Sequence, residues 1–136
     1  MQNEMIFCFG RPIIDITASI KERFLHKIGI NEKSSGKISM NRMELLLKQL
    51  SREADHILVS AGGVECNMAI NSAILGIPST FVGAIGDDYF HLIFKDSLGF
   101  VEKLNLCLIP ATNPINSAII AVIWITNEDG EKKRSK

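Results

Sequence analysis

The stretch that decides the fold is Ala61-Gly-Gly-Val-Glu-Cys-Asn-Met-Ala69, which leads from a short apolar segment into a helical pattern. Gly62 and Gly63 have no β-carbon, so the backbone there can take conformations that other residues avoid and can touch a ligand directly. Asn67 stands one helical turn later, where its amide can donate and accept hydrogen bonds. Together they indicate a neutral site that reads hydroxyl groups. The alternatives are a tight strand-to-helix turn without a ligand and an exposed helix residue.

Helical and strand patterns alternate on both sides of this turn, which predicts an α/β fold. The capping pattern of Asn41 and Glu44 predicts the start of the first helix, and Asp88 is predicted to cap the third. The predicted helices cover 41–50, 64–75 and 89–98, and the predicted strands cover 5–9, 14–20, 56–60, 79–82, 104–109 and 117–126.

Asp15 comes after the first buried strand, and α/β sheets place their ligands at the ends of strands. A carboxylate can accept hydrogen bonds from two neighbouring hydroxyl groups at once, which suits a ribose or another vicinal diol. The alternative for an isolated aspartate at such a place is a turn or cap residue. The sequence therefore makes Asp15 a candidate ligand for a sugar.

The order of glycine pair, helix, glycine and strand resembles the N-terminal signature of the ribokinase family of sugar and nucleoside kinases, also called PfkB carbohydrate kinases. An earlier segment, Gly10-Arg-Pro-Ile-Ile-Asp15, is most similar to the adenosine kinase branch of that family. The resemblance covers nearly the whole chain. The positions that match the main signature are Gly62, Gly63, Asn67, Ala69, Leu75, Gly76, Gly83, Ile85, Gly86 and Asp88.

This resemblance implies a ribokinase-like α/β sheet with flanking helices over residues 1–136, and a small β lid formed by strands at about 14–20 and 117–126. It implies that Asp15, Gly62, Gly63 and Asn67 bind the substrate, a small sugar or nucleoside. The reaction it implies is ATP-dependent phosphoryl transfer to a hydroxymethyl group, with ATP and Mg²⁺ as cofactors of the full-length enzyme.

The catalytic base of this family belongs to a glycine-rich Gly-Ala-Gly-Asp motif in the C-terminal half, and no Gly-x-Gly-Asp occurs in this sequence. We therefore assign no catalytic, cofactor-binding or metal residue here. The chain is expected to be a truncated, substrate-binding portion of a kinase that is inactive alone. The alternative is a non-catalytic remnant that serves as a ligand-binding or dimerisation module.

The composition argues against nucleic acid and membranes as partners of this chain. Fifteen basic and 15 acidic side chains balance, which gives no electrostatic case for binding nucleic acid or an anionic membrane. The longest apolar run, 118–125, has eight residues, whereas a membrane-spanning helix needs roughly 20. Cys8, Cys66 and Cys107 lack metal-ligand spacing and are expected to be reduced thiols of a cytoplasmic protein.

The apolar segment Ser117–Thr126 is predicted to be a strand, and its position near the end of the sequence bears on whether the chain dimerises. A turn pattern at 127–130 follows it, and few residues remain for a returning strand. An unpaired strand edge seeks a partner, because its backbone donors and acceptors need hydrogen bonds. We therefore expect a homodimer that forms through the lid strands.

Overall fold

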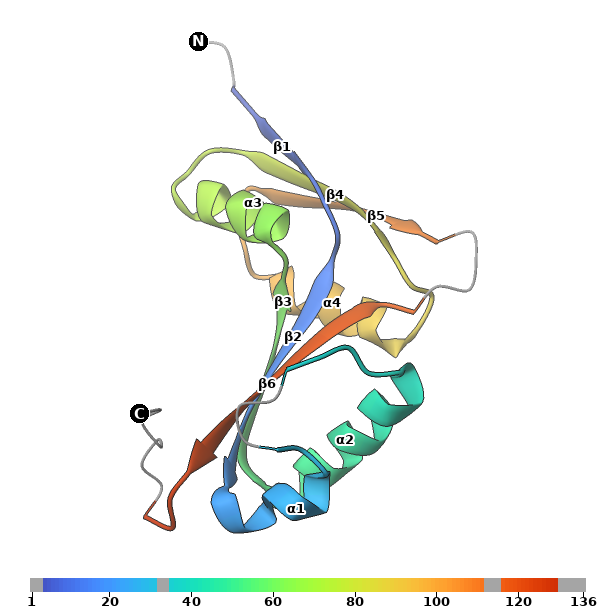
Figure 1. Cartoon of the computed structure of the whole chain (residues 1–136). Helices are drawn as coiled ribbons and strands as arrows, with labels where there is room; N and C mark the ends of the chain where they lie inside the picture. Colours follow the sequence, from blue (N-terminus) through green and yellow to red (C-terminus); the bar gives the residue numbers. More distant parts are fainter. Residues whose placement is uncertain (1–3, 32–34, 112–115, 130–136) are drawn as a thin grey trace. The chain divides into compact units, whose positions relative to one another are not determined.

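The computed structural model describes residues 4–31, 35–111 and 116–129 (Figure 1). The chain divides into two compact units. The first holds the chain up to Asp15 together with Val59–Ile120, and the second holds Ile16–Leu58 together with the chain from Ala121 onward. Each unit is described by itself below. No helix among the described residues is both long and apolar enough to cross a membrane.

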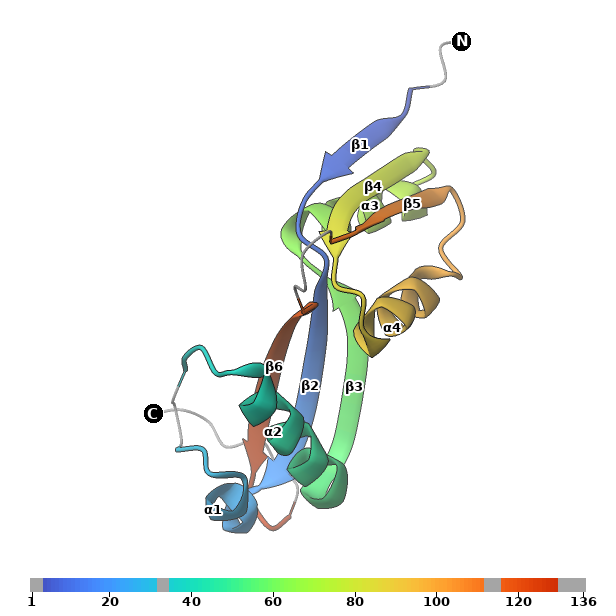
Figure 2. The same cartoon turned by 90° about the vertical axis from the view of Figure 1, so that its right-hand side faces the viewer.

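The first unit is built on a sheet of three parallel strands in the order β1-β4-β5 (Figures 1 and 2). β1 is Ile6–Phe9, β4 is Ser79–Ile85 and β5 is Leu104–Pro110. The register places Cys8 beside Phe81 and Phe81 beside Leu106. Parallel neighbours require crossover connections, and here these contain helices α3 and α4.

Helix α3 (Val64–Ile74) packs against β1 and β4. Helix α4 (Tyr89–Leu98) begins at Asp88, whose carboxylate accepts a hydrogen bond from the Phe90 amide at 3.1 Å. Its Phe94 ring lies 6.1 Å from that of Phe81, and both are fully buried. The core of this unit therefore lies between the sheet and these two helices. Its buried residues include Cys8, Cys66, Ala69, Ala73, Phe81, Ile85, Phe94 and Leu98.

A second sheet has the strand order β3-β2-β6. β3 is Ala54–Gly62, β2 is Ile13–Lys21 and β6 is Ala118–Thr126. In the second unit, helix α2 (Met40–Glu53) buries one side, and β2 buries alternate residues along its length. The alternation is that of a strand with one covered face. The remaining elements here are a 3-10 turn η1, Glu22–Phe24, and the short helix α1, Leu25–Ile28.

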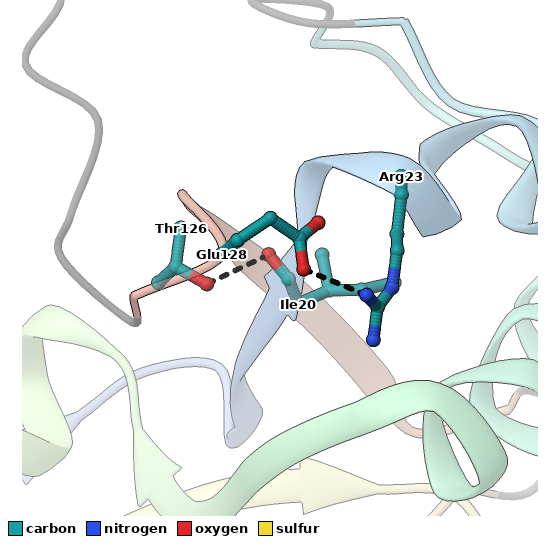
Figure 3. A network of polar contacts seen from close by, with 4 residues as sticks. All are labelled: Ile20, Arg23, Thr126 and Glu128. Carbon is teal, nitrogen blue, oxygen red and sulfur yellow. Dashed lines mark hydrogen bonds and ion pairs between the residues drawn. The ribbon is translucent and has the colours of Figure 1, made fainter.

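Polar contacts connect the C-terminal ends of β2 and β6 within the second unit (Figure 3). The Thr126 hydroxyl donates to the Ile20 carbonyl at 3.3 Å, and Arg23 forms an ion pair with Glu128 at 2.7 Å. The ion pair is exposed, so it contributes little to stability. The Thr126 contact is buried and therefore fixes the strand end more firmly.

The α/β fold predicted from the sequence is confirmed, but several boundaries differ. Strand β4 runs to Ile85 rather than to Val82, and the short elements η1 and α1 were not predicted. The N-cap of helix α2 is Ser39 rather than Asn41, because the Ser39 hydroxyl accepts a hydrogen bond from the Arg42 amide at 3.3 Å, and the helix runs from Met40 to Glu53. β3 is longer than the predicted strand at 56–60 and runs directly into the glycine pair. The predicted turn at 127–130 lies partly outside the described residues.

Candidate functional site

The glycine pair joins β3 to α3, as the sequence predicted (Figure 1). Gly63 has φ +102° and ψ 141°, a conformation that is essentially restricted to glycine. A β-carbon at Gly63 would also lie 2.6 Å from the Arg11 carbonyl oxygen. The turn therefore needs glycine for two reasons, its backbone conformation and its close approach to the segment after β1.

Asp15 lies near the start of β2, and its carboxylate is held against Gly62 so closely that a β-carbon there would collide with Oδ2. Asp15 is half-buried and has no hydrogen-bond or ion-pair partner among the described residues. Burial raises the pKa of this carboxyl above its ordinary value, because the charged form loses solvation. An accessible but unpaired carboxylate is ready to accept hydrogen bonds from a ligand.

The thiol near this carboxylate is Cys66, in the first turn of α3, and it is fully buried. Burial raises the pKa of the Cys66 thiol to about 12, and the charges of Cys8 and Asp15 act in the same direction. Cys66 is therefore a neutral thiol at physiological pH, unsuited to act as a nucleophile. It belongs to the apolar packing on which the glycine turn rests.

Asn67 lies in the first turn of α3, where its backbone amide donates to the Gly63 carbonyl at 2.8 Å. Its side chain is exposed and makes no hydrogen bond within the described part of the chain. The amide group thus keeps its full capacity to donate and to accept. The helix positions it one turn beyond the glycine pair, as the sequence predicted.

The segment between β1 and β2 packs closely against Glu65 and against Gly83, and the sequence analysis did not predict these two contacts. The Glu65 side chain lies over Gly10, where a β-carbon would collide with it. A β-carbon at Gly83 would lie 2.5 Å from the Gly10 carbonyl oxygen and 2.8 Å from Pro12 Cδ. Gly10 and Gly83 are the sequence features that could have indicated this close packing. Only the fold shows that Gly83 lies against the segment that contains Gly10.

A hollow of about 340 Å³ opens beside this segment and is lined in part by Arg11, Pro12, Gly86 and Ser117. None of the predicted residues Asp15, Gly62, Gly63 and Asn67 lines it. Gly63 lies close to the Arg11 carbonyl, and Arg11 also lines the hollow, whereas the Asp15 carboxylate does not line it.

Asp88 does more than cap α4, which was the role expected from the sequence. Its carboxylate also accepts hydrogen bonds from the Ser117 amide and hydroxyl, both at 2.7 Å. The side chain therefore fixes the entry to β6 relative to α4 within the first unit. Both oxygens of the Asp88 carboxylate thus accept hydrogen bonds from within the protein.

The described residues contain no group of three or more His, Cys, Asp or Glu side chains that could hold a metal ion. In this arrangement the Asp15 carboxylate can accept hydrogen bonds, and the Asn67 amide can donate and accept them.

Comparisons with known proteins agree with this description. No family model matches the chain. A curated relative, adenosine kinase from Schizophyllum commune, is 31% identical over 90 residues, which is 65% of this chain and 26% of the relative. Among solved structures, adenosine kinase from Schistosoma mansoni in complex with 2-fluoroadenosine superposes with a TM-score of 0.62 at 19% identity, over 91% of this chain and 36% of that one.

A probable sugar kinase from Rhizobium etli superposes with a TM-score of 0.58 at 25% identity, over 97% of this chain and 38% of that one. The chain therefore has the ribokinase-like fold, and the resemblance to the N-terminal part of PfkB adenosine and sugar kinases is confirmed. It spans about a quarter of the curated relative and about a third of the solved chains.

Proposed function

We propose that this chain is the substrate-binding portion of a ribokinase-like kinase that phosphorylates a hydroxymethyl group of a small sugar or nucleoside. The observation that carries the proposal is the Asp15 carboxylate, which is half-buried, pressed against Gly62 and without a partner in the described residues. Burying a carboxylate without a hydrogen-bond partner costs free energy, and the desolvation raises the pKa of Asp15. A ligand that donates hydrogen bonds would offset that cost.

The geometry of a carboxylate suits two adjacent hydroxyl groups. Each hydroxyl donates to one of the two oxygens, so a vicinal diol is held in a fixed orientation. Hydrogen bonds to the ionised form would also lower the raised pKa of Asp15. Binding should therefore release protons in the pH range in which the free Asp15 carboxyl titrates.

The glycine pair and Asn67 complete the proposed site. Because Gly62 and Gly63 have no side chains, a ligand beside Asp15 can approach the main chain there. Asn67, whose side-chain amide is exposed and unpaired in the described residues, would read a further hydroxyl. The role of these four residues is to fix the position and orientation of the acceptor alcohol, which is a large part of phosphoryl-transfer catalysis.

ATP and Mg²⁺ belong to the same proposal, as the phosphate donor and its counter-ion in an enzyme of full length. We assign both to the part of the fold that this chain does not span, since it covers 36% of the solved adenosine kinase chain. We accordingly expect no phosphorylation by this chain alone. Cys8, Cys66 and Cys107 are free, which fits a cytoplasmic location.

A second candidate function is a non-catalytic module that dimerises through the lid strands. The observation in its favour is on β6, where Ile120, Val122 and Trp124 alternate along the strand and are all exposed. A strand with an apolar exposed face favours association. This lid dimer is compatible with substrate binding, so the two functions are tested separately.

The test of the binding proposal is calorimetric titration of the purified chain with adenosine, ribose and fructose. We expect binding of at least one of them, and a loss of at least tenfold in affinity for Asp15→Ala, because removal of hydrogen bonds to a charged group costs about 1.5–3 kcal/mol. Asp55→Ala is the matched control, since Asp55 is an exposed carboxylate in the second unit. Equal affinities for wild type and Asp15→Ala would contradict the assignment.

A further inference from the structure

The hollow of about 340 Å³ in the first unit lies at the carboxyl ends of the parallel strands. The residues directly after β1, β4 and β5, which are Gly10, Gly86 and Ala111, all line it. Open α/β sheets bind their ligands outside the carboxyl ends of the strands. Pockets for small molecules range from roughly 300 to 1,000 Å³. The hollow therefore has the place and the size of a small-molecule site.

Arg11 gives this hollow its charge. Of the described residues that line it, Arg11 is the one with an ionisable side chain, and the others are apolar or neutral. Its side chain is exposed and forms no hydrogen bond or ion pair within the described part of the chain. Its backbone packs tightly, because a β-carbon at Gly63 would lie 2.6 Å from the Arg11 carbonyl oxygen. A closely packed backbone thus carries a guanidinium group that is available to a ligand.

Two carboxylates come near the lining without facing a ligand in the same way. Asp88 accepts hydrogen bonds from the Phe90 amide and from the amide and hydroxyl of Ser117, and it sits at the start of α4, where the helix dipole stabilises negative charge. Glu65 lies over Gly10 but does not line the hollow. The charge that a ligand meets directly is therefore that of Arg11.

The chemistry of the guanidinium group selects an anionic ligand. Its planar N–H donors match the two oxygens of a carboxylate or of a phosphate, and such charge-assisted pairs are stronger than neutral hydrogen bonds. Asn116 also lines the hollow, and its exposed side-chain amide makes no hydrogen bond with a described residue, so it can donate to the same group. A hydroxyl group offers one oxygen and no charge, and it gains less from these donors.

We propose that Arg11 determines substrate specificity, and that the sugar held by Asp15 carries a carboxylate or a phosphate that binds in the hollow. This inference rests on the proposed function, because it adds a second contact to the sugar that Asp15 positions. Arg11 is suited to this role because its carbonyl packs against the glycine pair while the same residue lines the hollow. The substrate class is then an acidic sugar with a free hydroxymethyl group, and not a neutral nucleoside.

The experiment is calorimetric titration of the full chain with two matched pairs of compounds, fructose with fructose 6-phosphate and glucitol with gluconate. The members of a pair differ in the anionic group, and all four compounds keep a hydroxymethyl group. We expect the wild type to bind the anionic member of at least one pair at least about tenfold more tightly than the neutral member. The pair that shows the larger preference identifies the anion as a phosphate or a carboxylate.

Arg11→Gln should abolish this preference and leave the affinity for the neutral member unchanged, whereas Arg11→Lys, which keeps the charge without the planar donors, should retain part of it. The fold should survive both changes, because the side chain is exposed, and circular dichroism verifies this. Arg52→Gln is the matched control, since Arg52 is an exposed arginine of α2 in the second unit.

The outcomes separate the role of Arg11 from that of Asp15. Equal affinities within both pairs, still reduced by Asp15→Ala, would overturn the role of Arg11 and leave the proposed function standing. An equal loss of preference for Arg11→Gln and Arg52→Gln would also overturn it, because the attraction would then be a general effect of charge. A preference that Arg11→Gln removes, with affinities that Asp15→Ala leaves unchanged, would support the anion site and contradict the proposed function.

Discussion

The two ends of helix α3 both rest on a glycine with positive φ, yet they differ in their surroundings. Gly63 at the start has φ +102°, and a β-carbon there would lie only 2.6 Å from the Arg11 carbonyl oxygen. Gly76 after the end has φ +92°, and a β-carbon there would meet only the Lys103 amine at 3.7 Å. The same local conformation is thus an ordinary helix end in one place and part of a tightly packed candidate site in the other.

The comparison shows that a glycine motif by itself does not mark a site. At Gly76 the conformation is sufficient to explain the residue, since helices commonly end with a left-handed glycine. At Gly63 the conformation and the packing together exclude any other residue. Substitutions at the two ends should therefore differ in size, and the difference measures how much of the constraint comes from packing.

The largest effect is expected for Gly63→Ala. Backbone strain in this region costs about 1–3 kcal/mol. The β-carbon would in addition clash with a backbone atom, which no side-chain rotation can relieve. We expect a loss of more than about 3 kcal/mol in the free energy of unfolding, against about 1–2 kcal/mol for Gly76→Ala. Urea denaturation of both variants measures this, and equal losses would show that packing at Gly63 contributes nothing.

A smaller effect is expected for Gly62→Ala, which has no positive φ and meets a side chain instead of backbone. The new β-carbon would displace the Asp15 carboxylate, which should cost about 1–2 kcal/mol of stability and abolish any ligand binding. Combining it with Asp15→Ala should restore most of the stability, because the clashing atoms are gone. A double-mutant cycle with no coupling between the two positions would contradict the contact.

The smallest effect is expected for Asp15→Asn. Because burial raises the pKa of Asp15 in the folded state, the folded protein binds this proton more tightly than the unfolded chain does. The wild type should then lose stability as pH rises from the ordinary aspartate pKa through the raised one, and keep that loss at neutral pH. Asp15→Asn should remove this loss and leave the protein slightly more stable at pH 7, by less than about 1 kcal/mol.

The measurement for Asp15→Asn is the difference in urea midpoint between wild type and variant, followed from acidic to neutral pH. The difference isolates Asp15 from the other carboxyls that titrate in the same range. A variant that is markedly less stable than wild type at neutral pH would show that Asp15 has a structural partner, and it would weaken the case for a ligand site.

The sequence alone determined the features that depend on near neighbours in the chain. The glycine pair predicted the turn into α3 because only residues without a β-carbon fit there, and Asp88 predicted the start of α4 because its partner, the Phe90 amide, is two residues away. The order of strands and helices, and with it the α/β class, followed from hydrophobic periodicity. Even so, the sequence pattern predicted the cap at Asn41, whereas the structure has Ser39 there, because both residue types can cap a helix.

Only the tertiary structure decided which of these features meet. Asp15 is close to Gly62, Glu65 covers Gly10, and Asp88 binds Ser117 across long stretches of sequence. The raised pKa of Asp15 is equally invisible in the sequence, because desolvation is set by atoms from distant segments. Local sterics and hydrogen bonding can be read residue by residue, whereas burial and close approach exist only after the chain has folded.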